Sequence, residues 1–301
     1  MLTEEVWRIF TEKKEEYLRE ISSDKFPIGI LLGGQGAVGK GQLNLWAERL
    51  YPKNVFLAIN GDNYRVWHPD FDRLRKDIWN YSKETQIFSN TFTEGLIENA
   101  ITNRFSLVVE GTMRSPEVPL QTAKKLRSNG YETAAFVIAA CKEFSLLNAF
   151  VRYYKEVQSK GFGRMIDIES HNKATEGLPK SVDRLYMEKS VDRICLFDCF
   201  AKNRIADYQL SDGRWNCETL PSAIIIATRK KQMDDQEGIE SLLNEASIAL
   251  ANTQDKKIIE QMRKAYDGLS PNYTNISKPY RPIELFPTFV PNKFSRKWKN
   301  S

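Results

Sequence analysis

The sequence predicts an α/β fold in which helices cover both faces of a parallel β-sheet. Short apolar runs recur along the chain with helical stretches between them, a pattern typical of strands that are buried on both faces. A glycine-rich loop follows the first run, and another helical stretch follows that loop. The runs expected to form five parallel strands are residues 28–32, 55–59, 107–109, 134–140 and 194–197.

The helical stretches are indicated by apolar residues that recur every three or four positions. Near the N-terminus, Val6, Ile9, Phe10, Tyr17 and Ile21 predict an amphipathic helix over residues 3–21, and Phe26-Pro27 ends it before the first strand. Further helices are expected at residues 87–101, at 144–157 and within 236–267.

The last third of the chain departs from this alternation. The turn signal Ser211-Asp212-Gly213 predicts a hairpin over residues 205–217, and residues 223–227 are expected to form a strand. From Ser270 onward five prolines exclude long helices, which predicts an extended or loosely docked tail. We therefore expect an N-terminal helix in residues 1–24, a central α/β domain in 25–220, and a helical, proline-punctuated extension in 221–301.

The composition is that of an ordinary globular protein. Apolar residues make up 41% and charged residues 28%, and a net charge of +5 over 301 residues suits an anionic substrate without requiring nucleic acid. There is neither an apolar run near the roughly 20 residues that span a bilayer nor a secretory signal pattern, so we expect a cytoplasmic protein without a membrane partner. Four cysteines without paired spacing and only two histidines predict reduced thiols rather than a zinc site.

The glycine-rich loop has the spacing of a phosphate-binding loop, or P-loop. Residues 34–40 read G-x-x-x-x-G-K, in which backbone NH groups surround an anion at a helix N-terminus. Lys40 would bring a positive charge to the outer phosphates. The chain is therefore expected to have a P-loop NTPase-like fold whose nucleotide contacts come from Gly34, Gln35, Gly36, Ala37, Val38, Gly39, Lys40 and Gly41.

One position of this motif is unusual. The residue after the lysine is normally Ser or Thr, whose hydroxyl ligates magnesium, and here it is Gly41. Magnesium keeps several water and phosphate ligands, so the loss of one hydroxyl need not abolish its binding. We expect magnesium to be held through phosphates and water, with Asp62 or Glu110 supplying the carboxylate, and a slower enzyme as the result.

Two acidic residues follow predicted strands, at the edge where ligands of parallel α/β sheets gather. Asp62 is a candidate base that accepts a proton from a substrate hydroxyl; the alternative is that residues 60–63 form only a turn that caps the next helix. Glu110 ends an apolar run, where a carboxylate needs partners or solvent, and binding a substrate hydroxyl is the functional interpretation.

Arginines are expected where the transferred phosphate develops charge, and Arg152 and Arg164 could supply them. From the residues alone, an exposed ion pair with Glu156 is the simpler interpretation of Arg152. His171 by itself predicts a capping or surface residue, and Cys195 and Cys199 are expected to pack rather than to ligate.

Taken together, these motifs resemble the zeta-toxin family, the kinase toxins of bacterial toxin-antitoxin systems. The resemblance covers roughly residues 5–200 and lies in the order and spacing of several motifs, of which the stretch from Glu110 to Thr133 is the most specific. The motifs are Leu31-Leu32-Gly33-Gly34-Gln35 before Gly39-Lys40, Asn60-Gly61-Asp62, His68-Pro69-Asp70-Phe71-Asp72, Thr93-Glu94, Val109-Glu110-Gly111-Thr112-Met113-Arg114, Val118-Pro119-Leu120-Gln121-Thr122-Ala123, Gly130-Tyr131-Glu132-Thr133, Arg152-Tyr153, and Arg164 ahead of His171.

The resemblance implies a kinase domain in residues 25–220 that uses ATP or GTP with magnesium. Its implied acceptor is the 3′-hydroxyl of the amino sugar in UDP-N-acetylglucosamine. Lys40 matches the P-loop lysine and Asp62 the general base, while Arg152 and Arg164 match the arginines that stabilise the transferring phosphate. Glu94, Glu110, Thr112 and Arg114 match the part of the motif set associated with the sugar-nucleotide substrate.

The departures from the family pattern leave two alternatives open. Besides Gly41, the chain has Gly36-Ala37-Val38 before the final loop glycine and Asn60 where an acid is usual. Another hydroxylated small molecule could be the acceptor, or the chain could be a nucleotide-binding homologue without activity. The resemblance also implies a small helical antitoxin, which we expect to be a separate chain.

Overall fold

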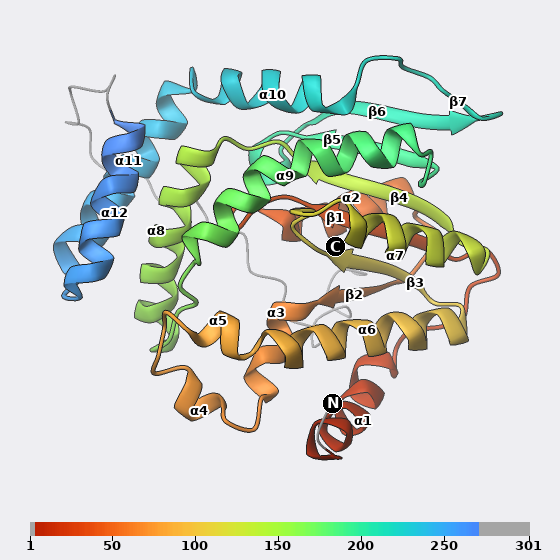
Figure 1. Cartoon of the computed structure of the whole chain (residues 1–301), viewed down its shortest axis with the longest axis horizontal. Coiled ribbons are helices and arrows are strands. Elements are labelled where there is room, and N and C mark those ends of the chain that lie inside the picture. The colour runs from red at the N-terminus through yellow and green to blue at the C-terminus, as the bar shows by residue number, and fades with distance from the viewer. Residues whose placement is uncertain (1–3, 271–301) are drawn as a thin grey trace, which may run out of the picture.

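The computed structural model describes residues 4–270, and its centre is a seven-stranded sheet with the strand order β2-β3-β1-β4-β5-β6-β7 (Figure 1). The first five strands run parallel, β6 is antiparallel to β5, and β7 is antiparallel to β6. The strands are β1 (Ile28–Gly33), β2 (Phe56–Asn60), β3 (Ser106–Glu110), β4 (Glu132–Ile138), β5 (Arg193–Phe197), β6 (Arg204–Ser211) and β7 (Arg214–Trp215). The five predicted parallel strands and the predicted hairpin are thus confirmed.

The helices have bounds close to those expected for the first two thirds of the chain. The predicted N-terminal helix is α1 (Glu4–Leu18), and the predicted helices near residues 87–101 and 144–157 are α6 (Gln86–Asn103) and α8 (Lys142–Lys160). The remaining helices are α2 (Leu43–Leu50), α3 (Gly61–Tyr64), α4 (Phe71–Leu74), α5 (Tyr81–Glu84), α7 (Glu117–Ser128), α9 (Ile168–Met187), α10 (Pro221–Gln232), α11 (Gln236–Asn252) and α12 (Lys256–Leu269), with 3₁₀ turns at Lys40–Gln42, Arg65–Trp67 and Cys199–Ala201.

Both faces of the sheet are buried, because alternate side chains of each strand enter different cores. On one face Leu31 and its neighbours pack against α6, α7, α9 and α10. On the other face Ile30 and Leu32 pack against α2. This arrangement confirms the prediction of helices on both faces of the sheet.

The strand register brings the functional ends of three strands to one edge. Leu32 of β1 lies opposite Glu110 of β3, and Glu110 lies opposite Asn60 of β2. The P-loop leaves β1 one residue beyond this level, since β1 ends at Gly33. Parallel strands must place their carboxyl ends together, so the register itself forms the floor of the site.

Two peripheral parts complete the structure. Helix α1 packs on α6 through Phe10, whose ring lies 5.2 Å from that of Phe92 in an edge-to-face contact. Helices α11 and α12 pack on α8 as a separate apolar cluster, away from α7 in Figure 1. Among the described residues no helix is long and apolar enough to cross a membrane. The predicted tail beyond Ser270 lies outside residues 4–270.

The expected strand at residues 223–227 is wrong, because these residues form the first turns of α10. Pro221 occupies the first turn of that helix, where its missing NH costs nothing. Ile225 is fully buried while Ile226 is 59% exposed, which is the one-sided burial of a surface helix. A run of five apolar residues cannot separate strand from helix by its pattern alone.

The packing of α9 predicts a test of stability at Gly177. A Cβ there would lie 2.0 Å from the carbonyl oxygen of Arg114, so the backbone of one segment must move. We expect Gly177→Ala to lower the free energy of unfolding by about 2 kcal/mol. The matched control is Gly268→Ala in α12, where a Cβ meets nothing within 4 Å; it should be neutral or stabilise by about 0.5 kcal/mol. Thermal and denaturant unfolding measure the free energy of unfolding of both variants. If Gly177→Ala were as stable as Gly268→Ala, the close contact at Gly177 would be contradicted.

Candidate active site

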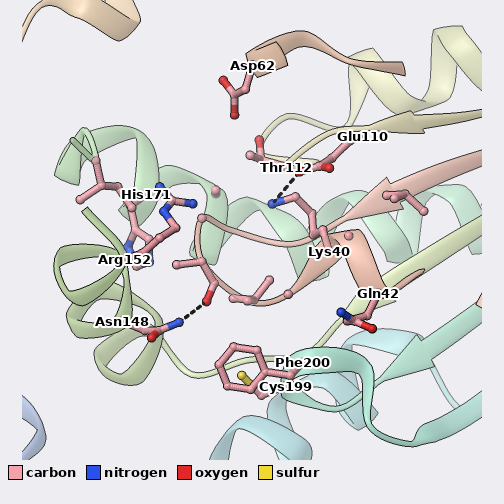
Figure 2. Close-up of a pocket in the computed structure, with 18 of the residues that line it drawn as sticks. Lys40, Gln42, Asp62, Glu110, Thr112, Asn148, Arg152, His171, Cys199 and Phe200 are labelled. Atoms are coloured by element: carbon pink, nitrogen blue, oxygen red, sulfur yellow. Dashed lines mark hydrogen bonds and ion pairs between the residues drawn. The ribbon is translucent and has the colours of Figure 1, made fainter. Parts of the chain in front are cut away.

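The P-loop connects β1 to the 3₁₀ turn that precedes α2, and its backbone has the conformation that glycine permits. Gly34 and Gly39 have φ angles of 148° and 83°. A Cβ on Gly39 would lie 2.8 Å from the Cα of Phe200, so this position needs glycine for space as well as for conformation. The loop therefore depends on the segment after β5, which packs directly against it (Figure 2).

Three hydrogen bonds hold the loop from outside. Phe200 donates its backbone NH to the carbonyl of Val38 at 3.0 Å, and Asn148 of α8 donates its side-chain amide to the carbonyl of Ala37 at 2.8 Å. Gln35 is fully buried and donates to the carbonyl of Ala140 at 2.8 Å. Because these bonds use loop carbonyls and the Gln35 side chain, they leave the loop NH groups free to meet an anion.

Lys40 extends from the loop toward Glu110. Its ammonium donates to the carbonyl of Gln35 at 2.9 Å and lies 3.7 Å from Glu110 Oε1 (Figure 2). Burial lowers the pKa of Lys40, although the charges of Glu110 and Asp62 oppose this effect. A cation that is buried with one distant carboxylate gains from an additional anion, which is what a phosphate would provide.

Asn60 and Asp62 divide the two functions that the sequence left open for this segment. Asn60 caps α3, since its Oδ1 accepts from the backbone NH of Asp62 at 3.0 Å, and its Nδ2 donates to Glu110 Oε2 at 2.8 Å. The side chain of Asp62 is left free of capping and faces the site. Asn60 is therefore the residue that caps the helix, and Asp62 remains the candidate base.

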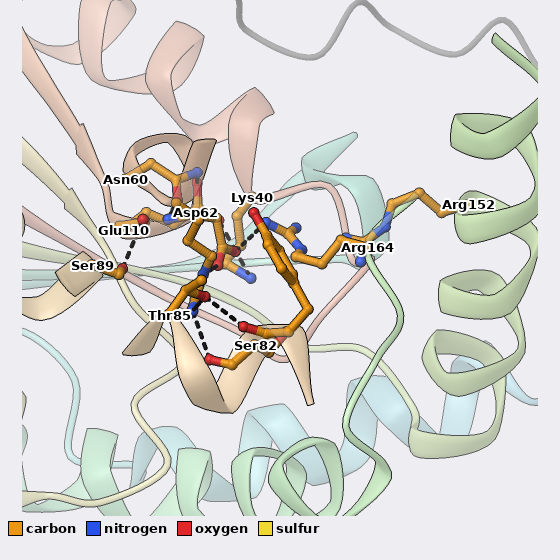
Figure 3. A network of polar contacts seen from close by, with 12 residues as sticks. Lys40, Asn60, Asp62, Ser82, Thr85, Ser89, Glu110, Arg152 and Arg164 are labelled. Carbon is orange, nitrogen blue, oxygen red and sulfur yellow. Dashed lines mark hydrogen bonds and ion pairs between the residues drawn. The ribbon is translucent and has the colours of Figure 1, made fainter. Parts of the chain in front are cut away.

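Asp62 is held by two arginines. Arg65 Nε donates to its Oδ1 at 2.9 Å, and Arg164 Nη1 lies 2.6 Å from its Oδ2 (Figure 3). Burial alone would raise the pKa of Asp62, but the charges of Arg164 and Arg65 outweigh it and lower the pKa to about 2. The carboxylate is thus ionised throughout the neutral range. The same contact raises the pKa of Arg164 against the opposing effect of burial.

Arg152 lies beyond Arg164 as seen in Figure 3, and it is not the exposed ion pair considered from its spacing. Its side chain is 24% exposed, and its Nε stands 3.8 Å from Glu156 Oε1, too far for a hydrogen bond. This Nε is buried and has no hydrogen-bond partner among the described residues. Burial and the nearby charge of Arg164 lower the pKa of Arg152. The unsatisfied donor marks a place for an anion.

These groups line a cavity of about 1460 Å³ between the P-loop, α8 and the 3₁₀ segment after β5. Its walls include every charged residue predicted for the site except Glu94, together with Thr112 and the loop residues from Gly36 to Gly41. Glu94 lies exposed on α6 and does not line the cavity. The volume exceeds the 300 to 1,000 Å³ typical of a single small-ligand pocket, which is consistent with two ligands side by side.

A triphosphate fits these residues, because the loop NH groups, Lys40 and the unpaired Nε of Arg152 present donors to one region. For magnesium, a Cβ on Gly41 would meet nothing within 4 Å, so space is present where the usual hydroxyl is lacking. No group of three or more His, Cys, Asp or Glu side chains in residues 4–270 forms a metal site by itself. The site therefore fits an ion held mainly by phosphates and water, with Asp62 or Glu110 as the acidic contribution.

Two features of the site were not found from the sequence. His171 is buried rather than on the surface, and its Nε2 lies 3.0 Å from Ser145 Oγ, which also accepts from Gln35 below the P-loop. Arg65 was not recognised at all, although its spacing of three residues from Asp62 is typical of an ion pair on a helix. The four cysteines are free thiols as expected, and Cys195 is fully buried while Cys199 lines the cavity.

Fold and site together define an α/β protein of the P-loop class, with a glycine loop, a buried lysine and a carboxylate between arginines. The family model described as zeta toxin matches residues 13–211. The chain therefore belongs to the zeta-toxin family, as its motifs predicted.

Individual relatives agree with this assignment. The chain is 34% identical over 135 residues to Toxin PezT of Streptococcus pneumoniae, covering 44% of this chain and 52% of that protein. It is 31% identical over 189 residues to Toxin zeta of Enterococcus hirae, covering 60% and 65% respectively. It thus spans between about half and two thirds of the length of these relatives. A solved structure from the PezAT chromosomal toxin-antitoxin system of S. pneumoniae has the same fold, with a TM-score of 0.65, 21% identity, and coverage of 89% of this chain and 96% of that one.

The burial of His171 predicts a pH dependence of stability. Burial lowers the pKa of His171 to about 4, below the usual value near 6.5, so the unfolded chain binds a proton that the folded chain does not. This contribution to stability is complete above pH 6.5 and decreases as the pH falls toward 4. The free energy of unfolding should decrease from pH 7 to pH 5 in both proteins. We expect this decrease to be about 2 kcal/mol smaller in His171→Gln than in wild type.

The control is the second histidine, His68, which is partly exposed and whose pKa burial also lowers. His68→Gln should show a smaller difference from wild type. Urea unfolding at a series of pH values measures all three proteins. If the free energy of unfolding varied with pH in the same way for wild type and His171→Gln, His171 would take up a proton as readily in the folded as in the unfolded chain, and the prediction would be contradicted.

Proposed function

We propose that the protein is a kinase that transfers the γ-phosphate of ATP or GTP to the 3′-hydroxyl of the amino sugar in UDP-N-acetylglucosamine, and that it acts as a toxin. The observation that carries this proposal is an ionised, half-buried carboxylate, Asp62, held between cations beside the P-loop. Nucleotide binding alone would need only the cations. A carboxylate among them, facing the cavity, is what transfer to a hydroxyl requires.

The side chains have distinct parts in this reaction. The loop NH groups and Lys40 bind the β- and γ-phosphates, and Arg152 and Arg164 neutralise the charge that spreads over the transferring group. Asp62 orients the acceptor hydroxyl and takes its proton as the oxygen attacks phosphorus. Magnesium, held through phosphates and water with Asp62 or Glu110 as the acidic contribution, would neutralise phosphate charge.

The sugar-nucleotide acceptor is supported by the walls of the cavity beside the nucleotide. Glu110, Thr112 and Arg114 line it and offer an acceptor, a hydroxyl and a cation to hydroxyl and diphosphate groups. Relatives named Toxin zeta and Toxin PezT support the toxin assignment. The solved neighbour belongs to a toxin-antitoxin system, so we also propose a separate antitoxin chain as the partner of this protein.

A second candidate is a nucleotide-binding homologue without transferase activity. Gly41 favours it, because the hydroxyl that normally grips magnesium is absent. Asn60, which stands where the family usually has an acid, is not evidence for an inactive homologue, because its side chain has a structural role between α3 and Glu110. The retained set of Lys40, Asp62, Arg152 and Arg164 argues for activity.

The proposed reaction is tested with labelled ATP or GTP, magnesium and a panel of nucleotide sugars. We expect label in UDP-N-acetylglucosamine, and a loss of at least 100-fold in Asp62→Asn with nucleotide binding retained, because general-base catalysis supplies factors of this order. Expression of wild type, but not of Asp62→Asn, should slow the growth of a bacterial host. Transfer to a different acceptor would correct the substrate, and absence of transfer to any acceptor would support the second candidate.

The glycine after the P-loop lysine gives a separate prediction. The free space at Gly41 accommodates a side chain, so Gly41→Thr should fold normally and supply the missing magnesium ligand. We expect a lower magnesium concentration at half-maximal rate and a turnover raised several-fold. Gly41→Val, which is nearly the same size without a hydroxyl, is the matched control. Unchanged turnover and metal dependence in Gly41→Thr would exclude a metal-binding role for this position.

A further inference from the structure

The two oxygens of Asp62 are held by arginines in very different environments. Arg65 belongs to the 3₁₀ turn that follows α3, three residues from Asp62, and is only 5% exposed. Arg164 lies in the segment between α8 and α9, and its side chain is 28% exposed. Each contacts one oxygen, so both oxygens of the proposed base are paired with a guanidinium; Figure 3 shows Arg164 beside Asp62.

Arg65 is fixed by hydrogen bonds to other groups of the protein. Its Nη1 donates to the carbonyl of Ser82 at 2.7 Å and to Thr85 Oγ1 at 2.6 Å, and its Nη2 donates to Gln86 Oε1 at 3.0 Å. Thr85 is itself fully buried and donates to the carbonyl of Tyr81 at 2.6 Å. With its Nε on Asp62, the guanidinium is bound on every nitrogen, so it cannot leave the carboxylate without breaking a buried network.

Arg164 has no such anchor. Its guanidinium contacts Asp62 Oδ2, and residues 4–270 provide it with no other hydrogen bond or ion pair. Its backbone NH donates to Glu156 Oε2 at 2.9 Å, which holds the chain while leaving the side chain able to turn. A bound γ-phosphate would compete for this guanidinium, since phosphate and carboxylate accept the same fork of donors.

We propose that Arg65 is the positioning residue of the proposed base, holding Oδ1 of Asp62 throughout the reaction, whereas Arg164 is an exchangeable partner that releases Oδ2 when it moves to the transferring phosphate. This inference rests on the proposed function, because it names the residue that positions the base of that reaction. The proton of the acceptor hydroxyl goes to Oδ2, the oxygen that Arg164 vacates, as the new P–O bond forms and the bond to the leaving nucleoside diphosphate breaks.

The exchange has a useful chemical consequence. While Arg164 caps Oδ2, the carboxylate is a weak base with its pKa held low and has no open oxygen for a hydroxyl. Departure of Arg164 removes one of the three arginine charges that lower the pKa of Asp62, the others being Arg65 and Arg152, so the basicity of Asp62 rises only in the presence of nucleotide. Arg65 keeps the remaining oxygen in place, which preserves the near-attack geometry on which phosphoryl transfer depends.

The test compares Arg65→Gln and Arg65→Lys with wild type in full-length protein, using ATP, magnesium and UDP-N-acetylglucosamine. Without Arg65 the base is misplaced and less acidic, so Arg65→Gln should lower kcat 10- to 100-fold while the KM for ATP changes less than about 3-fold. The acid limb of the pH profile of kcat should move up by about one unit. Arg65→Lys keeps the charge without the fork and should restore the acid limb with only partial recovery of kcat.

The chain offers a matched control in Arg73. It also pairs with an aspartate three residues away, Asp70 at 2.8 Å, but both side chains are exposed and lie outside the cavity lining. Arg73→Gln should leave kcat, KM and the pH profile unchanged. If Arg65 only ties α3 to the segment around α5, Arg65→Gln would lower the melting temperature while kcat per folded molecule and the acid limb stayed as in wild type, and the proposal would be overturned.

Two further measurements keep the proposal separate from folding and from the choice of acceptor. If Arg65→Gln does not fold, Thr85→Val loosens the guanidinium without removing its charge; kcat should fall about 3- to 10-fold with an unchanged acid limb, and an unchanged kcat would count against positioning. If no acceptor supports transfer, the proposed function fails on its own. The pKa of Asp62, measured by carbon-13 NMR, should still rise on binding a non-hydrolysable ATP analogue and be higher by about one unit in Arg65→Gln; no difference between the proteins would refute the role of Arg65.

Discussion

The structure of the site depends on the burial of more positive than negative charge at one edge of the sheet. Lys40, Arg65, Arg152 and Arg164 face the carboxylates of Asp62, Glu110 and Glu156. Burying ions is costly unless each has a close partner, and here the partners are shared, distant or, for the Nε of Arg152, absent. An anion with several oxygens resolves this imbalance, so this electrostatic constraint favours a phosphate within the site.

The scaffold tolerates that charge because the surrounding elements are fixed by other interactions. The P-loop is held by the carbonyl contacts of Val38 and Ala37 and by the buried side chain of Gln35, none of which uses the NH groups that a phosphate would need. Asn60 ties α3 to Glu110 in a comparable way. The ligand-binding donors are thus preorganised by groups that take no part in binding, which lowers the cost of ordering the site.

Most of the framework could be predicted, because its signals are local. Five apolar runs became parallel strands, Asp212 and Gly213 adopt the positive φ angles of a tight hairpin turn, and the loop from Gly34 to Lys40 lies where the motif required it. The prediction failed where a signal was too short or lacked direction. Residues 223–227 offered no period that separates strand from helix, and a lone histidine such as His171 carries no information about which side of α9 it occupies.

The sequence by itself determined the class of fold, the phosphate-binding loop, the missing hydroxyl at Gly41 and the identity of the candidate base, since each is carried by residue type and spacing along a few consecutive positions. Only the tertiary structure decided which side chains share the cavity. In the folded chain Glu94 is exposed on α6, whereas Arg152 is largely buried. Arg65 donates hydrogen bonds to Asp62 and to the carbonyl of Ser82. These outcomes depend on the rotation of helices and on contacts between segments far apart in the chain, which local sequence patterns do not encode.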